Sequence, residues 1–62
     1  MSDREIVNCL LIKECEISNR IHNAVTEILR HGYDSERGKL QVPYMIESIQ
    51  YILEDIERVV NR

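Results

Sequence analysis

The chain has 62 residues, of which 44% are hydrophobic and 31% are charged, and its net charge is −3 at pH 7. A chain this short buries only about 60% of the surface that its unfolded form exposes, so we expect one domain, residues 1–62, that depends on close helix packing or on self-association. The acidic balance argues against nucleic acid as a partner, because nucleic-acid-binding domains usually carry a basic patch, and no apolar run approaches the ~18 residues of a membrane-spanning helix.

The first predicted helix spans residues 3–31. Ser2 and Glu5 have the spacing of a capping box, in which the serine oxygen accepts a hydrogen bond from a first-turn N–H and the glutamate reaches back to the cap. Neither Pro nor Gly interrupts the chain before Gly32, which is well placed to end the helix in a left-handed conformation. We therefore expect one uninterrupted helix, roughly 43 Å long.

The connection is predicted over residues 32–42, which is long for a link between two helices. We expect Leu40 and Val42 to fold back onto the helices. The charged side chains of the connection, between Gly32 and Leu40, are expected to be solvated. Pro43 suits the first position of a helix, so the second helix is predicted over residues 43–60, roughly 27 Å long. The predicted fold is an all-α antiparallel two-helix hairpin.

Both predicted helices carry an apolar stripe, and residues 6–12 are apolar nearly all round, with Asn8 as their only polar member. Because the second helix is about ten residues shorter, we expect residues 3–12 to extend beyond it. A second copy is the simplest cover for this segment, giving a homodimer with a four-helix arrangement. The residues expected in the dimer interface are Ile6, Val7, Leu10, Leu11, Ile12 and Ile17.

Glu14 interrupts the apolar arc of the first helix. One interpretation is a contact with a partner, or an ion pair with Arg58 or Arg62 that sets the register of the interface. The alternative is a carboxylate that is simply solvated at the rim, where the second helix ends.

Tyr44 and Tyr51 are seven residues apart and therefore share one face of the second helix, together with Glu47 and Glu54. Tyrosine is enriched in binding hot spots, so this acidic face is a candidate docking site for a protein partner. The alternative is that each ring lies flat on its own helix.

The cysteines and histidines do not have the close pairwise spacing of a zinc site. Cys15 and His22, seven residues apart on one helix, are also too far apart for a catalytic pair, which needs hydrogen-bond contact. We therefore expect packed free thiols, no cofactor, no metal and no enzymatic activity. The polar start Met-Ser-Asp-Arg-Glu is unlike a signal peptide. We therefore expect a cytoplasmic location.

Two resemblances concern the whole chain. In architecture the hairpin resembles the plasmid copy-number repressor that binds paired RNA as a dimer of hairpins, although the connection here is longer and no basic helix face is evident. The acidic chain beginning Met-Ser-Asp-Arg-Glu-Ile-Val-Asn-Cys-Leu-Leu also resembles the small early helical proteins of lambdoid phages. That resemblance carries no diagnostic motif. It implies a non-enzymatic regulatory protein that binds host or phage proteins in the host cytoplasm; the alternative function is a nucleic-acid-binding regulator that acts as a dimer of hairpins.

Overall fold

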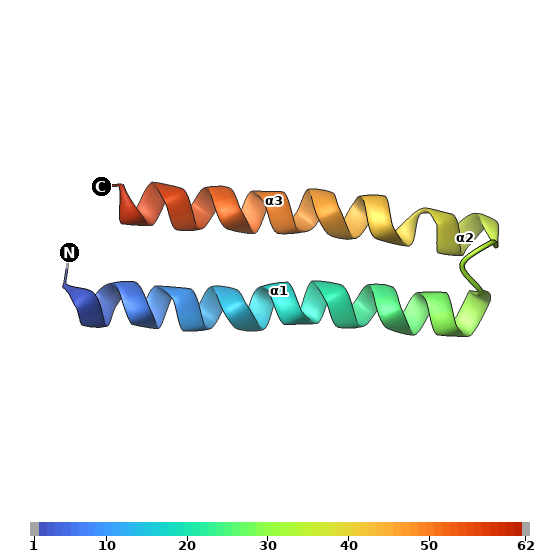
Figure 1. Ribbon diagram of the computed structural model, residues 1–62, viewed down its shortest axis with the longest axis horizontal. Helices are drawn as coiled ribbons and strands as arrows, with labels where there is room; N and C mark the ends of the chain where they lie inside the picture. The colour runs from blue at the N-terminus through green and yellow to red at the C-terminus, as the bar shows by residue number, and fades with distance from the viewer. Residues whose placement is uncertain (1, 62) are drawn as a thin grey trace.

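The computed structural model describes residues 2–61, which form an all-helical hairpin (Figure 1). Helix α1 spans Asp3–His31, the one-turn helix α2 spans Glu36–Lys39, and helix α3 spans Gln41–Val60. Helices α1 and α3 run antiparallel, so the start of α1 and the end of α3 lie at the same end of the hairpin (Figure 1). The predicted all-α hairpin is confirmed, as are the bounds of the first helix.

The ends of α1 are capped largely as the sequence indicates. Ser2 has an extended backbone, and its Oγ accepts a hydrogen bond from the Glu5 N–H at 3.3 Å. Of the two bonds of a capping box, this is the one found among the described residues. At the other end, Gly32 has φ 86°, a region that favours glycine, and its N–H donates to the Ile28 carbonyl at 2.7 Å.

The connection differs from the predicted loop over residues 32–42, because part of it is helical. Ser35 acts as the N-cap of α2, with its Oγ accepting from the Gly38 N–H at 2.9 Å and donating to the Gly32 carbonyl at 2.7 Å. A Cβ at Gly38 would collide with that Gly32 carbonyl oxygen. The turn is therefore tight enough to require glycine at position 38.

The predicted start of the second helix at Pro43 is also wrong, since α3 begins at Gln41 and Pro43 is its third residue. The first four N–H groups of a helix have no partner within it, so proline costs no hydrogen bond there. Pro43 cannot donate to the Lys39 carbonyl, which prevents α2 and α3 from merging and explains the break at Leu40. Leu40 is exposed and Val42 half-buried, so only Val42 partly packs as expected.

Glu27 ties the connection to the end of α1. Its carboxylate lies 3.3 Å from His31 Nε2 and 3.9 Å from Arg30 Nη1 on the same helix, and 3.5 Å from Arg37 Nε on α2. One carboxylate therefore meets side chains from both elements, which holds α2 beside the last turn of α1.

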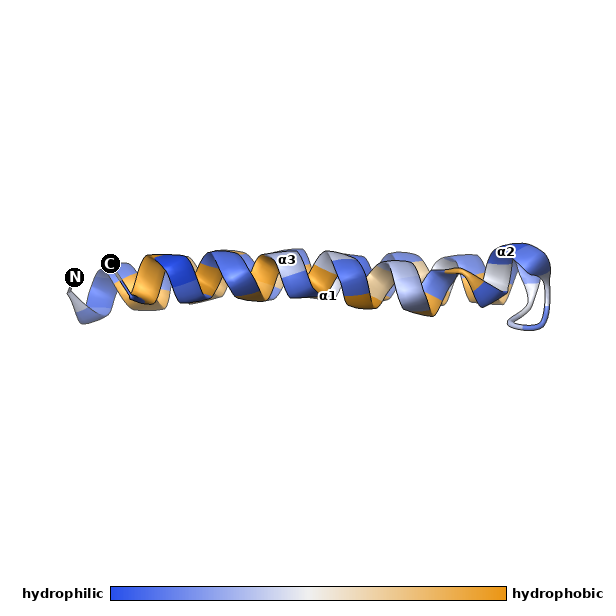
Figure 2. Ribbon diagram, turned by 90° about the horizontal axis from the view of Figure 1, so that it is seen from above, coloured by the Kyte–Doolittle hydropathy of each residue, from blue (hydrophilic) through white to orange (hydrophobic). Residues whose placement is uncertain are grey.

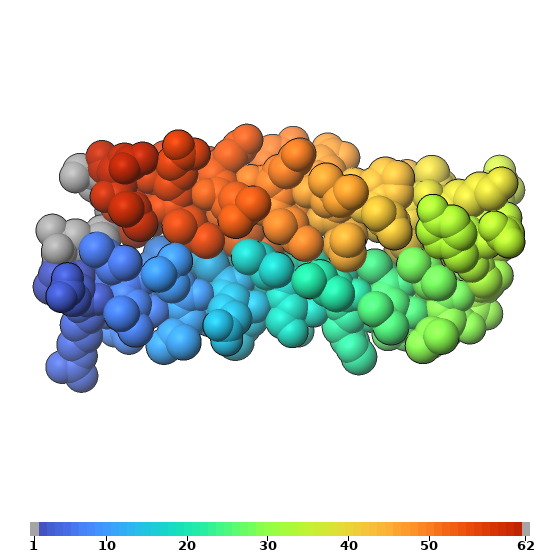
Figure 3. Space-filling model, in the orientation of Figure 1, coloured from blue at the N-terminus to red at the C-terminus, as the bar shows by residue number. Residues whose placement is uncertain are grey.

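The two long helices overlap along most of their length. Lys13 Nζ on α1 lies 3.8 Å from Asp55 Oδ2 on α3. Because α3 continues for five more residues to Val60, its end is level with about residue 8 of α1. Figure 3 shows α3 lying against α1 along most of the length of α1. The predicted overhang of residues 3–12 is therefore too long: only about residues 3–7 extend beyond the end of α3, because the helical connection and the earlier start of α3 lengthen the second arm.

The hairpin is a single layer of two helices, with extents of 46 × 15 × 7 Å and a radius of gyration of 14.5 Å. A compact domain of this length would have a radius of gyration of about 11 Å. Ala24 on α1 and Ile52 on α3 are the only hydrophobic side chains of residues 2–61 that are buried. One chain alone therefore has a seam between two helices rather than a full hydrophobic core.

Candidate interaction surfaces

One face of the helical layer is apolar and exposed. Measured at 100° per residue from the buried Ala24, the exposed apolar side chains of α1 other than Ile12 fall about 40° to 140° to one side. Those of α3, measured from the buried Ile52, fall about 80° to 120° to the same rotational side. Because the helices are antiparallel, these two arcs open on the same face of the layer. This apolar face comprises Val7, Leu10, Leu11, Ile21, Val25, Leu29, Ile46, Leu53 and Val60.

Figure 2, seen along the plane of the layer, shows hydrophobic and hydrophilic stretches following each other turn by turn along both helices. That pattern is expected for helices that are apolar on one side only. Leu29, whose side chain is 82% exposed, marks one end of the apolar face. The apolar face thus runs nearly the whole length of α1, rather than being confined to its N-terminal turns.

The accessible surface of the chain is larger than its mass requires. It amounts to 5005 Å² for a chain of 7.3 kDa, whereas a compact monomer of that mass exposes about 4,200 Å². The excess of about 800 Å² equals the area that each partner buries in a standard protein–protein interface. The surface in excess is therefore of the size that one partner would cover.

The six residues predicted for a dimer interface do not all lie on the apolar face. Val7, Leu10 and Leu11 do, and each is exposed. Ile6 and Ile17 are half-buried along the seam with α3. Ile12 is 60% exposed, but its place on the helix turns it to the opposite face.

From the helical wheel, the C-terminal part of the α1 apolar stripe is expected to pack against the second helix. The stripe is wider than one neighbouring helix can cover, which leaves part of it exposed. The helical period identifies the residues that belong to the apolar stripe of α1, but the sequence does not show which edge of that stripe faces α3. The apolar face also contains exposed residues outside the six expected in the dimer interface: Ile21, Val25, Leu29, Ile46, Leu53 and Val60.

Polar side chains of α1 lie in the middle of the apolar face. Glu14 is exposed there, and Arg58, one of its expected partners, instead has Nη2 3.0 Å from Asp55 Oδ1. Arg62, the other expected partner, lies outside the described residues. A shallow open hollow of about 430 Å³ is lined by Glu14, Ile17, Ser18, Ile21, His22 and Val25.

The predicted tyrosine face is on the other side of the layer. Tyr44 and Tyr51 are 58% and 61% exposed, and Glu47 and Glu54 beside them are exposed as well. We call these four residues the tyrosine face. Neither tyrosine is covered by another part of the described chain, so both rings are available to a partner.

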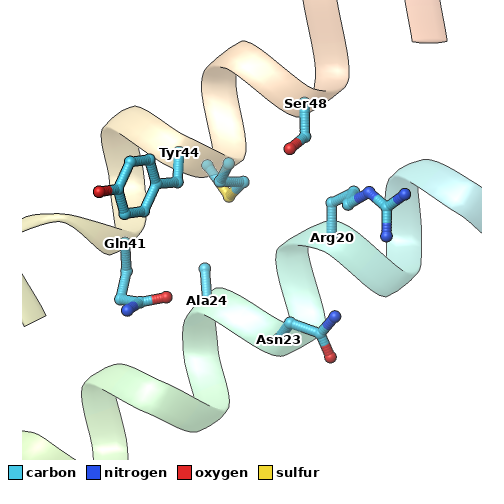
Figure 4. A pocket seen from close by; sticks show the side chains of 7 residues that line it. Arg20, Asn23, Ala24, Gln41, Tyr44 and Ser48 are labelled. Carbon is cyan, nitrogen blue, oxygen red and sulfur yellow. The ribbon is translucent and has the colours of Figure 1, made fainter. Parts of the chain in front are cut away.

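Tyr44 borders a small hollow of about 120 Å³ between the two helices (Figure 4). Ala24 of α1 points between the helices there, and its small side chain leaves room between the neighbouring longer ones. The hollow is lined by Arg20, Asn23, Ala24, Gln41, Tyr44, Met45 and Ser48. Tyr44 therefore shares this hollow with polar side chains of α1, whereas Tyr51 does not line it.

Several of the basic side chains are held by acidic ones. Lys13 and Arg58 both contact Asp55, while Arg30 and Arg37 both contact Glu27. Each acidic side chain offsets the positive charge of the basic side chains beside it. These four basic side chains therefore do not form a continuous basic strip along one helix. Within residues 2–61, no group of three or more His, Cys, Asp or Glu side chains is placed to hold a metal ion. Cys9 is half-buried and Cys15 is exposed, and both are free thiols.

Comparisons with protein families, with curated proteins and with solved structures find no match to this chain. No helix in the described part of the chain has both the length and the apolar character needed to cross a lipid bilayer. What the protein binds has therefore to be inferred from its own surfaces: an extended apolar face and, opposite it, the tyrosine face.

Proposed function

We propose that this chain is a non-enzymatic interaction protein, which associates with itself through the apolar face and binds another protein through the tyrosine face. The observation that supports self-association is the contrast between two buried hydrophobic side chains and the long exposed apolar face. A helix pair that is apolar on one side needs a second layer to complete its core. A second hairpin supplies that layer and yields a four-helix arrangement.

Self-association through the apolar face leaves the tyrosine face uncovered. Tyr44 and Tyr51 lie on the opposite side of the layer, so a face-to-face dimer would carry a tyrosine face on each of its two outer surfaces. Two equal docking sites on one particle would allow bivalent binding, which raises the overall affinity for a dimeric or multivalent partner. We infer a regulatory role by binding alone, of the kind implied by the resemblance to small early phage proteins.

Sedimentation equilibrium of the full chain at micromolar concentration tests the self-association. The expected result is twice the chain mass of 7.3 kDa. A helical monomer at that concentration, with helicity checked by circular dichroism, would overturn this half of the proposal and leave the apolar face as a site for a different protein.

Affinity capture from a bacterial lysate tests the second half. We expect a captured protein to be lost when Tyr51 is changed to Ala. It should be retained when Val25 on the apolar face is changed to Glu, with a lower affinity for a multivalent partner because that change dissociates the dimer. Retention by Tyr51→Ala together with loss by Val25→Glu would instead assign the partner to the apolar face. Salt titration of the captured complex also checks the nucleic-acid alternative, since binding through phosphates weakens steeply with salt.

A further inference from the structure

Seven residues of α1 are spaced symmetrically about Ser18. Val7 and Leu29 are each eleven residues from Ser18, Leu11 and Val25 are each seven away, and Glu14 and His22 are each four away. Their separations of three and four residues keep all seven within about 80° of the helix surface. This strip lies on the apolar face and its outer edge. Residues at equal distances on either side of its centre are of the same kind, apolar with apolar, except for one pair in which an acid corresponds to a histidine. The strip consists of Val7, Leu11, Glu14, Ser18, His22, Val25 and Leu29.

We propose that the apolar face binds a second copy of this chain with the two α1 helices antiparallel and the two-fold axis passing beside Ser18. This inference rests on the self-association proposed above and specifies its geometry. In this packing Val7 faces Leu29 of the second copy, and Leu11 faces Val25. Glu14 faces His22 of the second copy, and the symmetry forms this acid–histidine contact twice.

The polar centre of the apolar face favours this arrangement. A carboxylate pressed against apolar side chains loses its hydration without compensation, which is costly. A histidine ring carries at least one N–H donor whether or not it is charged, so His22 can satisfy Glu14 across the interface. Glu14, Ser18 and His22 already line one hollow of about 430 Å³. The small Ser18 side chain at the axis allows the two helices to approach closely.

The other helix independently leads to the same axis. The contact between Lys13 and Asp55 sets the register of the hairpin, and it places Ser18 level with about residue 50 of α3. Ile46 and Leu53, both exposed on the apolar face, are centred between residues 49 and 50. An axis at this level therefore brings Ile46 of one copy against Leu53 of the other. One two-fold axis thus pairs exposed apolar side chains on both arms: Val7 with Leu29 and Leu11 with Val25 on α1, and Ile46 with Leu53 on α3.

A two-fold axis parallel to the helices is the competing arrangement, and it would stack α1 of one copy on α3 of the other. Glu14 would then lie level with about residue 54 of the second copy, against the turn that presents Leu53. The carboxylate would face an apolar side chain there and would have no histidine opposite it. The antiparallel contact between the α1 helices avoids that cost.

Disulfide trapping tests the geometry in the full chain with Cys9 and Cys15 changed to Ser. Cysteines form a disulfide only when their Cα atoms are within about 7 Å. Under mild oxidation, Ser18→Cys should form a covalent dimer, because the two copies of this residue meet at the axis. Leu11→Cys alone should not, since its two copies lie about 21 Å apart along the helices. An equal mixture of Leu11→Cys and Val25→Cys chains should cross-link to each other.

Failure of both the Ser18→Cys and the mixed cross-links, in a chain that still sediments as a dimer, would overturn this packing and leave self-association intact. Sedimentation as a helical monomer would instead overturn the proposed function itself. Tyr51→Cys, on the tyrosine face, is the matched control, and it should not form a covalent dimer at the same protein concentration.

A charge exchange tests the Glu14–His22 contact separately. Glu14→Arg and His22→Glu should each weaken the homodimer by at least about tenfold, because each removes an attraction or creates a repulsion at both contacts. An equal mixture of the two variants should form a heterodimer with nearly the original affinity. In that heterodimer the introduced arginine faces the introduced glutamate at one contact, and the original acid–histidine pair is kept at the other. Absence of that recovery would show that these two positions do not meet.

Discussion

Lys13 Nζ on α1 lies 3.8 Å from Asp55 Oδ2 on α3, and this pair marks the register in which the two long helices lie side by side. Asp55 also forms an ion pair with Arg58, whose Nη2 lies 3.0 Å from Oδ1, and Lys13 Nζ also lies 3.4 Å from Glu16 Oε2. Charged side chains therefore border the seam on the side away from the apolar face. The apolar surface of the chain is concentrated on the other side as a consequence.

Changing Asp55 to Ala should lower the free energy of unfolding by no more than about 1 kcal/mol, because the carboxylate is about half exposed and exposed ion pairs contribute little. The difference from the original chain should shrink at about 1 M NaCl, where salt screens the charges. Urea denaturation at low and high salt measures both effects. Glu57→Ala on the same helix is the control for loss of an acid. A loss above about 2 kcal/mol would mean that the pair is far less solvated than its geometry indicates.

Changing Gly38 to Ala should destabilise the hairpin by about 1–3 kcal/mol, since the added methyl group would collide with the Gly32 carbonyl oxygen. That oxygen already accepts from the N–H and the hydroxyl of Ser35, so it cannot easily move away. Thermal or urea unfolding measures the change. Lys39→Ala, next in sequence and exposed, should change the stability by only a few tenths of a kcal/mol. Equal stability of the two variants would show that the turn opens at little cost.

The length of α1 and the antiparallel direction of the two long helices followed from the sequence, because Ser2, Gly32 and the uninterrupted helical period between them leave few alternatives. The connection did not follow, since its shape depends on a close backbone contact between Gly32 and Gly38 that no periodic pattern records. Pro43 is predicted as the first residue of its helix, although proline fits the first turn more generally. That two-residue shift, together with α2, changed the expected overlap of the helices.

The candidate surfaces could be predicted in part, because the helical period shows which residues share a face but does not show how the two helices pack. The exposure of Tyr44 and Tyr51 follows from their position opposite an apolar stripe, so the helical wheel was sufficient. The apolar face required knowledge of the direction in which α3 approaches α1. Ile12 and Val25 illustrate the difference, because both are apolar residues of α1 that are largely exposed, yet they lie on opposite faces of the layer.

Changing Glu27 to Gln should loosen the connection without unfolding the hairpin. The variant keeps the shape of the side chain and removes the charge that His31 and Arg37 approach within 3.5 Å. We expect a local cost of about 0.5–1.5 kcal/mol, since the carboxylate is only partly exposed while Arg37 is mostly exposed. Native-state amide exchange should therefore become faster at Gly38 and Lys39 than in the original chain.

The amide of Ala24, in the buried seam, serves as the internal control for the Glu27→Gln variant. Its exchange should change by no more than the change in global stability, which urea denaturation measures separately. Equal acceleration at Gly38 and Ala24 would contradict a local role for Glu27 and would make it part of the global unfolding unit.

A charge placed on the apolar face should dissociate the dimer, whereas the same charge on the opposite face should not. Val25 and Ile12 form a matched pair for this test, because both are β-branched residues within α1, with side chains 47% and 60% exposed. Val25→Glu should weaken self-association by at least about a hundredfold, since an uncompensated carboxylate would be buried at the interface in each copy. Ile12→Glu should leave the dimer mass in sedimentation equilibrium unchanged, because its side chain points to the tyrosine side of the layer. The reverse result would return the interface to the N-terminal segment 6–12, and circular dichroism of both variants ensures that the comparison is between folded chains.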